Sequence, residues 1–237
     1  MYRNNFWQNN CKYIRIKCIF EQINQAKMKQ YIITSLAVLT ASTAVYAQDV
    51  NKTNAQGKRE GVWVGYYPKT NYVKFEGTFK DGKETGTFKF YADEPEKKLI
   101  ATKEFKADGS VYAIFYNGKK KMSEGLYVNK LREGIWKVYH VDGQNILAEE
   151  PYKNDKIHGV KKAYYISGKL SEELEYKNGV ENGISNQYAE NGVKIKETQY
   201  VNGNLDGKII IRDETGKITD EAKYVNGKLI VPKKTTK

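Results

Sequence analysis

Apolar and polar positions recur along the chain in the same order every 24 or 25 residues. Each recurrence opens with a small residue and continues as a short alternating stretch, as in GVWVGY, GTFKFY and GIWKVY. Self-similarity at a fixed period of this length is the signature of a repeat architecture. We therefore expect seven units, which open at Gly61, Gly86, Ser110, Gly134, Gly159, Gly183 and Gly207.

Each unit is expected to contain two short strands joined by tight turns. The alternation in residues 160–165 is typical of the first strand, and phrases of the form E-x-x-aromatic, such as ELEY at 173–176, predict the second. Asn-Gly or Asp-Gly follows most of these phrases and predicts a type I′ turn, because both central residues of that turn need positive φ. Glycine-bearing turns at this spacing leave no room for helices.

The pattern predicts an all-β fold. About seven tandem β-hairpin units of 24 residues should stack into an elongated, twisted antiparallel sheet over residues 57–230. One hairpin is marginal alone in water, so each unit should gain its order from its neighbours.

Two rows of aromatic residues follow from the repeat. We expect the fifth residue after each opening position to form a buried ladder of repeat-core aromatics: Tyr66, Tyr91, Phe115, Tyr139, Tyr164 and Tyr188. The second residue should point to the opposite face. This second row supplies the candidate ligand-facing aromatics, which are Trp63, Phe88, Tyr112 and Trp136.

Residues 28–47, MKQYIITSLAVLTASTAVYA, are typical of a secretory signal peptide. Lys29 supplies a positive charge, an apolar or small-residue region follows, and small residues precede a cleavage site between Ala47 and Gln48. The stretch is short and rich in Ser and Thr for a transmembrane span. A buried helix is the alternative interpretation. Cleavage would make this an exported protein, periplasmic or extracellular.

The remaining boundaries follow from composition. Residues 1–27 show no periodicity, and we interpret them as upstream sequence called as coding, with translation starting at Met28; a genuine cytoplasmic extension is the alternative. Both cysteines lie in that segment, so a mature chain would rely on packing without disulfides. We expect residues 48–56 to form a linker and residues 231–237 a basic tail.

The order of the phrases G-x-W-x-x-Y, E-x-x-Tyr and Tyr-x-Asn-Gly resembles that of MORN-repeat proteins, over nearly all of residues 57–229. The resemblance is greatest to the bacterial variant type, which is often labelled antitoxin-like. It implies β-hairpins laid side by side and a binding or scaffold role, with no shared catalytic residues. The acidic insertion ADEPEKK at 92–98 departs from the pattern.

No set of residues in the sequence indicates catalysis, so we expect no enzyme activity, no cofactor and no metal. His140 and His158 lack the partners that a zinc site needs. The glutamates that open the E-x-x-aromatic phrases occur once per unit, from Glu76 to Glu221, and should pair across strands with lysines. A net charge of +12 with both signs interleaved indicates a solvated surface.

The first functional hypothesis is a non-enzymatic interaction or scaffold module whose partner is a protein or a cell-envelope component. Cell-wall or glycan binding and antitoxin-like binding of a toxin are the alternatives. We expect no nucleic-acid binding, because export and mixed charge argue against it. A weak, salt-sensitive association with membrane surfaces is a further alternative. Open sheet ends also allow an edge-to-edge homodimer.

Overall fold

The computed structural model describes residues 49–231, which contain eighteen β-strands and no helix. In chain order these are β1 (Lys52–Thr53), β2 (Arg59–Tyr66), β3 (Val73–Lys80), β4 (Lys83–Tyr91), β5 (Leu99–Phe105), β6 (Val111–Asn117), β7 (Lys120–Val128), β8 (Leu131–Tyr139), β9 (Ile146–Lys153), β10 (Lys156–Ile157), β11 (Gly159–Tyr164), β12 (Leu170–Lys177), β13 (Val180–Tyr188), β14 (Lys194–Val201), β15 (Asn204–Leu205), β16 (Gly207–Arg212), β17 (Ile218–Val225) and β18 (Lys228–Leu229). This part of the chain contains no helix able to cross a membrane.

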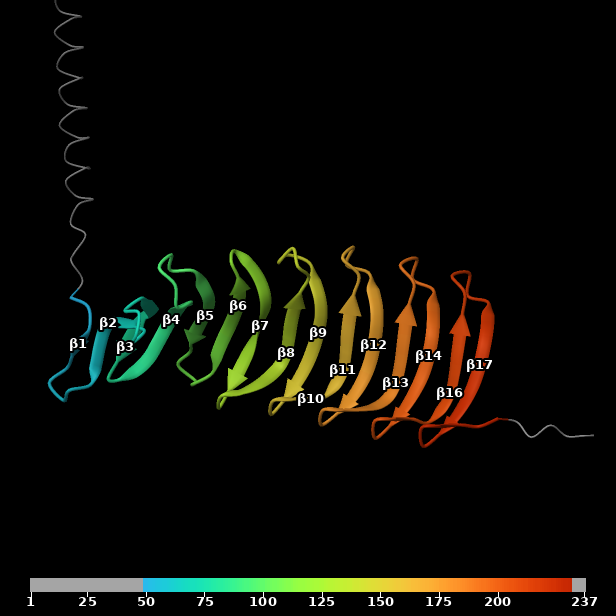
Figure 1. Cartoon of the computed structure of the whole chain (residues 1–237). Helices are drawn as coiled ribbons and strands as arrows, with labels where there is room; N and C mark the ends of the chain where they lie inside the picture. Colours follow the sequence, from blue (N-terminus) through green and yellow to red (C-terminus); the bar gives the residue numbers. More distant parts are fainter. Residues whose placement is uncertain (1–48, 232–237) are drawn as a thin grey trace, which may run out of the picture. The chain divides into compact units, whose positions relative to one another are not determined.

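The strands pair antiparallel with their neighbours in the sequence and lie side by side in chain order (Figure 1). The short strands β10 and β15 pair back onto β9 and β14, while β11 and β16 extend the sheet. Among the described strands, β1 and β18 occupy opposite edges, so the sheet is open. The predicted all-β array of hairpin repeats in one antiparallel sheet is confirmed.

The turns after the E-x-x-aromatic phrases have the backbone that the sequence predicts. Asn178 and Gly179 have φ values of 54° and 88°, and the same pair of positive angles recurs at the other Asn-Gly turns. Two turns place a residue other than glycine at the second position. These residues are Lys130, with φ of 68°, and Asp155, with φ of 65°. Residues other than glycine rarely adopt this left-handed backbone conformation, so the presence of Lys130 and Asp155 at these positions needs an explanation.

The two faces of the sheet carry different rows of side chains, which we call the aromatic face and the ladder face. Residues paired in register share a face. The aromatic face carries Trp63, Phe79, Phe88, Trp136 and Tyr152. The ladder face carries Tyr91, Tyr139, Tyr164 and Tyr188, together with the glutamates that they contact.

The core lies on the aromatic face. Phe88 is 2 % exposed and Trp136 is 4 % exposed. Glycines make room for both rings, since a Cβ on Gly77 would lie 2.4 Å from Phe88 and one on Gly125 would lie 2.3 Å from Trp136. The sequence predicts that these two rings are exposed toward a ligand, and that prediction is wrong. Each ring lies flat over a glycine and packs against its aromatic neighbours.

The ladder row has mixed burial. Tyr91 is 7 % exposed, Tyr139, Tyr164 and Tyr188 are half-buried, and Tyr66 is 48 % exposed. A buried hydroxyl needs a partner, and the half-buried position leaves each ring packed while its hydroxyl reaches a carboxylate. The row therefore combines packing with a repeated hydrogen bond.

The third unit is out of phase with the others. Five residues separate Phe105 from Val111, whereas six separate Tyr127 from Gly134 in the next unit. Val111 therefore faces Tyr127 where the next unit places Gly134 opposite Tyr152. A slip of one residue moves every side chain to the other face. Phe115 therefore lies on the aromatic face, contrary to its expected place in the ladder row. Tyr112 moves to the ladder face for the same reason.

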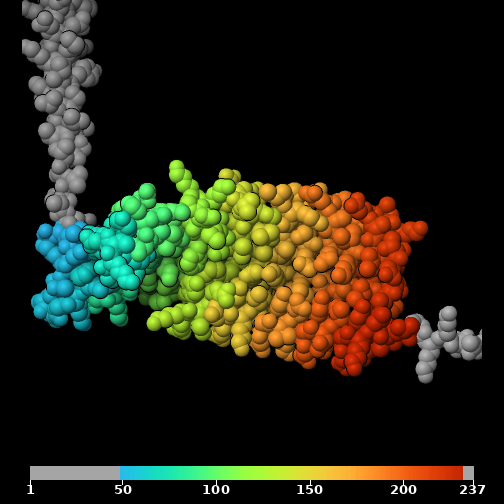
Figure 2. All heavy atoms as spheres, in the orientation of Figure 1, coloured from blue at the N-terminus to red at the C-terminus, as the bar shows by residue number. Residues whose placement is uncertain are grey.

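Side chains at the turns tie each unit to the next. The residue before an opening glycine accepts a hydrogen bond from the backbone N–H of the following turn, as at Glu133, which accepts from Asn154 at 3.0 Å. The same bond joins three further pairs: Glu60 with Asp81, Asn182 with Asn202, and Asp206 with Asn226. Successive colour bands are in direct contact along the described part of the chain in Figure 2. Each unit is therefore stabilised by its contacts with the neighbouring units.

The N-terminal edge is covered by residues that we expected to be a linker. β1 lies within residues 48–56 and pairs with β2, Lys52 opposite Glu60. The backbone N–H of Asn51 bonds to the carbonyl of Val62, and the indole of Trp63 donates to the carbonyl of Lys52 at 2.9 Å. The sheet therefore begins inside the expected linker.

Candidate functional site

A repeated bond joins tyrosine and glutamate across the ladder face. The Tyr91 hydroxyl donates to Glu76 at 2.6 Å, and Tyr164 donates to Glu149 at 2.9 Å. The same bond joins Tyr139 to Glu124 and Tyr188 to Glu173, always fifteen residues apart. The second unit has Thr102 where the others place this glutamate, and the last has Arg212 where the others place this tyrosine.

The bond between Tyr91 and Glu76 moves the pKa of both partners away from neutrality. Burial, followed by the bond to glutamate, raises the pKa of Tyr91 and Tyr164 to about 12. The hydrogen bond from Lys97, followed by that from Tyr91, lowers the pKa of Glu76. A general acid or base needs the opposite shift, toward the working pH. The tyrosine–glutamate row is therefore built as a structural network.

The glutamates also alternate with lysines across the sheet. Glu124 lies opposite Lys137, which in turn lies opposite Glu149, and Lys162 continues the row. Opposite charges in directly facing positions stabilise a sheet by about 0.2–1 kcal/mol per pair. The row is interrupted at Asn186, which lies between two glutamates, and its side-chain oxygen is buried without a hydrogen-bond partner among the described residues.

A hollow of about 640 Å³ opens on the aromatic face beside the third unit. Phe105, Val111 and Tyr127 form its apolar floor, and each is half-buried. Lys103 stands beside the floor, and Lys130 lies at the rim. An apolar floor with a few charged groups beside it is the usual form of a binding site.

The register of the third unit explains the hollow. In the other units an opening glycine faces the aromatic ring of the E-x-x-aromatic phrase, as Gly134 faces Tyr152. In the third unit Val111 lies between Phe105 and Tyr127. One row further along, Ala113 occupies the place that Trp136 holds in the next unit, directly opposite Gly125. Smaller side chains on the aromatic face therefore leave space there.

Lys103 brings an unbalanced positive charge to the aromatic face. Its ammonium lies 5.5 Å from the ring centre of Phe90 and 5.8 Å from that of Tyr127. None of the ion pairs found within residues 49–231 includes Lys103 or Lys130. Both cations are therefore open to an external anion.

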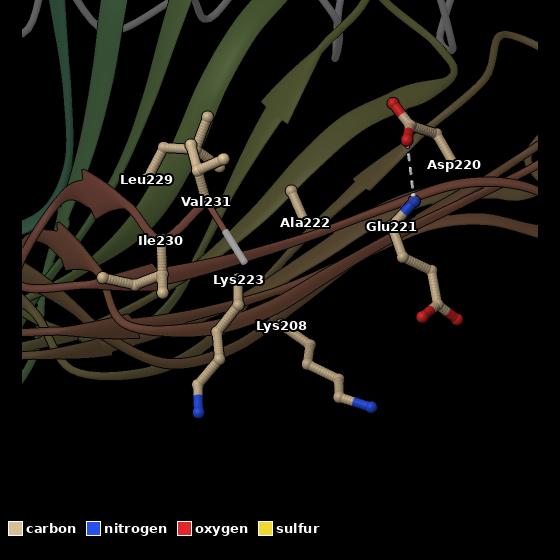
Figure 3. A pocket seen from close by; sticks show the side chains of 8 residues that line it. All are labelled: Lys208, Asp220, Glu221, Ala222, Lys223, Leu229, Ile230 and Val231. Carbon is tan, nitrogen blue, oxygen red and sulfur yellow. Dashed lines mark hydrogen bonds between the residues drawn. The ribbon is translucent and has the colours of Figure 1, made fainter. Parts of the chain in front are cut away.

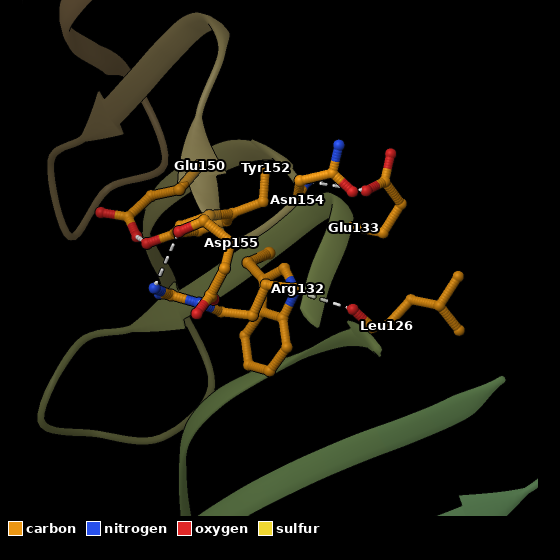
Figure 4. Close-up of polar contacts among 8 residues, drawn as sticks. Leu126, Arg132, Glu133, Glu150, Tyr152, Asn154 and Asp155 are labelled. Carbon is orange, nitrogen blue, oxygen red and sulfur yellow. Dashed lines mark hydrogen bonds and ion pairs between the residues drawn. The ribbon is translucent and has the colours of Figure 1, made fainter. Parts of the chain in front are cut away.

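Lys130 and Asp155 occupy the same strained position in successive turns, but only Asp155 has a partner. Its carboxylate accepts from the Arg132 side chain, and that guanidinium lies 3.9 Å above the ring of Tyr152 (Figure 4). Lys130 is exposed and makes no side-chain contact of this kind within the described range. Glycine would be less strained at this position. A strained backbone position whose side chain makes no stabilising contact indicates a functional site.

The structure separates the four candidate ligand-facing aromatics. Phe88 and Trp136 are core, Trp63 is half-buried beside β1, and Tyr112 lies on the other face. None of them lines the hollow. The sequence signals for the hollow are a lysine where most turns have glycine, and one residue fewer between Phe105 and Val111 than in the corresponding turns.

Other expected features lie partly outside the described range. Residues 1–27, the signal peptide with its Ala47–Gln48 cleavage site, and residues 232–237 of the basic tail are not among the described residues. Within residues 49–231, no group of three or more His, Cys, Asp and Glu side chains is arranged to hold a metal ion.

No known protein-family model matches the chain, and no curated protein matches it. Among solved structures, one similarity is to a mutant of TarM from S. aureus in complex with fondaparinux, α-GlcNAc-glycerol and UDP. The identity is 15 %, the match covers 51 % of this chain and 19 % of TarM, and the TM-score is 0.22. A likeness this weak carries no argument about fold or function.

Proposed function

We propose that this chain is a non-enzymatic interaction module that holds an acidic segment of a partner protein in the hollow beside the third unit. Two lysines without counter-charges beside an apolar floor carry the proposal. An apolar side chain of the partner would contact Phe105, Val111 and Tyr127. Carboxylates beside that side chain would pair with Lys103 and Lys130, which fixes orientation and specificity.

The state of the floor rings favours a protein segment over a sugar. Tyr127 meets Trp136 edge to face at 4.9 Å and has Lys103 above its ring, while Phe105 meets Phe88 edge to face at 5.0 Å. Sugar rings stack on broad, free aromatic faces. Rings already held by neighbours instead offer edges and partial surfaces, against which an aliphatic or aromatic side chain packs.

A scaffold role agrees with the rest of the molecule. The Glu and Tyr side chains of the ladder face serve neighbour contacts, and the pKa shifts of Glu76, Tyr91 and Tyr164 lead away from neutral pH. The resemblance to MORN-repeat proteins, as an expectation from the sequence, points to the same class of function. Export to the periplasm or beyond remains a prediction from residues 28–47. N-terminal sequencing of the mature protein tests that part separately.

A direct binding experiment tests the hollow. The probe is a short labelled peptide with a central Trp flanked by glutamates, with matched peptides in which Gln or Lys replaces Glu. Fluorescence anisotropy should show binding of the acidic peptide alone, weakening as salt rises. The double variant Lys103→Glu/Lys130→Glu should lose this binding. The double variant Lys153→Glu/Lys177→Glu, which alters exposed lysines of β9 and β12, serves as the charge-matched control and should bind as before.

Other outcomes would contradict the proposal. Equal binding of the three peptides would show that charge does not select the ligand. Loss of binding in the Lys153→Glu/Lys177→Glu control would show that only net charge matters. Tighter binding of an acidic polysaccharide than of the peptide, abolished by the same double variant, would assign the hollow to glycans.

A further inference from the structure

The last long strand, β17, has an outer edge that is mostly unpaired within residues 49–231. β18 pairs with it only at Tyr224 and Val225, and the N–H of Ile230 bonds to the carbonyl of Lys223. Beside the unpaired part lies a hollow of about 480 Å³ whose apolar lining includes Ala222, Leu229 and Ile230 (Figure 3). An unpaired edge of this kind is a template for an additional strand.

Earlier units show what belongs at this edge. The glutamate that opens an E-x-x-aromatic phrase faces the next strand, and in three units it meets a lysine there: Glu76 meets Lys89, Glu124 meets Lys137 and Glu149 meets Lys162. In the two units before β17 the facing residues are Asn186 and Ile210. Four of these glutamates also accept a tyrosine hydroxyl from that next strand. Glu221 holds the same position on β17, is exposed, and has no such lysine or tyrosine among the described residues.

The edge is shielded in a way that discourages pairing between two copies. The backbone N–H of Glu221 donates to the side chain of Asp220 at 2.9 Å (Figure 3). Two such edges in antiparallel contact would bring Asp220 and Glu221 close to the same acidic pair of the other copy. Like charges in facing positions destabilise a sheet. A strand with a lysine at this point would instead find an opposite charge.

The opposite edge of the sheet is closed to the same kind of addition. β1 already pairs with β2, and Asn51 makes bonds with both Val62 and Val64. Head-to-tail assembly of two copies would have to displace these residues. The C-terminal edge is therefore the one that can receive a strand.

We propose that the outer edge of β17 binds an extended, lysine-bearing strand of a partner protein. The lysine faces Glu221, the strand backbone takes the place of the Asp220 carboxylate at the Glu221 N–H, and apolar side chains of the strand contact Ala222, Leu229 and Ile230. Main-chain bonds supply affinity and the alternate side chains supply specificity. This second site is independent of the acidic-segment hollow and would let one chain hold two partners of opposite charge.

The chain itself provides a suitable probe. A blocked, labelled peptide with the sequence of residues 158–166, HGVKKAYYI, contains the lysine that faces Glu149 and the tyrosine that bonds to it. The matched control peptide has glutamate in place of Lys162. Fluorescence anisotropy with the full chain should show a preference of about tenfold for the lysine peptide. Glu221→Lys should reverse the preference, and the reversal itself shows that the variant is folded.

Hydrogen exchange identifies the site and the alternative occupants. The lysine peptide should slow exchange of the Glu221 amide, while Lys103→Glu/Lys130→Glu leaves this binding unchanged. Equal binding of both peptides, or no protection at Glu221, overturns the proposal. Protection that grows with protein concentration alone assigns the edge to a second copy and also overturns it. Protection that disappears when residues 232–237 are deleted assigns it to this chain's own tail, with the same consequence.

Discussion

The hydroxyl of Tyr164 donates a hydrogen bond to the carboxylate of Glu149 across the boundary between two units, at 2.9 Å. Glu149 lies on β9, and Tyr164 lies at the end of β11, so the bond joins the end of one hairpin to the next. It recurs wherever the sequence places both residues. The row of tyrosine–glutamate bonds thus ties neighbouring hairpins together. A single hairpin could not gain this stabilisation on its own.

Removing this hydroxyl should destabilise the sheet. Tyr164→Phe keeps the ring but leaves Glu149 without its donor, and we expect a loss of about 1 kcal/mol, toward the low end for a bond to a charged group because the site is half-buried. Urea unfolding followed by circular dichroism measures the change. Tyr66→Phe is the matched control, because Tyr66 is 48 % exposed and has no glutamate fifteen residues before it. An equal loss in both variants would contradict a role for the bond.

Stability should fall at both extremes of pH. The pKa of Tyr91, Tyr139, Tyr152 and Tyr164 is raised from 10.0 to about 12, mainly by burial and then by hydrogen bonds to glutamate. The folded state holds these protons more tightly, so their contribution is complete below pH 10 and is lost as pH rises through 12. Thermal unfolding at stepped pH measures this loss, which should be smaller in Tyr164→Phe.

The acid side has the opposite sign. The pKa of Glu76 is lowered from 4.5, first by the hydrogen bond from Lys97 and then by that from Tyr91. Its contribution is present above pH 4.5 and disappears as pH falls through the lowered value. Glu76→Gln should flatten this part of the stability profile. An unchanged acid limb in the variant would contradict the assignment.

Completing the interrupted charge row should stabilise the protein. Asn186 lies between Glu173 and Glu197 and has a buried side-chain oxygen without a partner in the described part of the chain. Asn186→Lys should raise the free energy of unfolding by about 0.2–1 kcal/mol, with the gain reduced at high salt. The converse change, Lys162→Asn, should lower it by a similar amount. A loss of stability in Asn186→Lys would show that the site cannot accommodate the longer side chain.

The glycines under the core rings should tolerate no side chain. A Cβ at Gly125 would lie 2.3 Å from the Trp136 ring, so Gly125→Ala should cost about 1–3 kcal/mol through overpacking. The double variant Gly125→Ala/Trp136→Leu tests the cause, because a smaller ring-free side chain relieves the overlap. Its loss should be less than the sum of the two single losses, as a double-mutant cycle of unfolding energies measures. Simple additivity would contradict the packing argument.

Replacing Lys130 with glycine should raise the stability of the fold and weaken binding of the acidic peptide. Lys130→Gly removes a side chain from a left-handed backbone position with φ of 68° and should stabilise the fold by about 1 kcal/mol. The same change should weaken binding of the acidic peptide, since one of the two cations is lost. Unfolding and anisotropy on the same preparation measure both effects. A destabilised variant would show that Lys130 is retained for the fold.

Much of the fold follows from sequence because turn chemistry and period agree. Asn178-Gly179 needs positive φ at both residues and has it, and the 24-residue spacing stacks each hairpin on the next. The choice of core face was wrong because both faces carry aromatic rows. Gly77 and Gly125 decide it, since the absence of side chains there lets Phe88 and Trp136 lie flat against the sheet.

The hollow was missed because counting from an opening residue assumes equal turns. Counting places the third opening at Ser110, but the shortened spacing between Phe105 and Val111 reverses the faces of β6. A period averaged over seven units conceals a shift of one residue in a single unit. Such a shift nevertheless turns every side chain of the strand to the other face. The strain at Lys130 is likewise a property of the backbone, which composition does not reveal.

The most direct test of the proposed function exchanges charges on both sides of the hollow. Calorimetric titration would compare the full chain with Lys103→Glu/Lys130→Glu, each against the glutamate-flanked peptide and its lysine-flanked counterpart. We predict that the unaltered chain binds only the glutamate peptide and that the double variant binds only the lysine peptide. Continued binding of the glutamate peptide by the double variant would contradict the account.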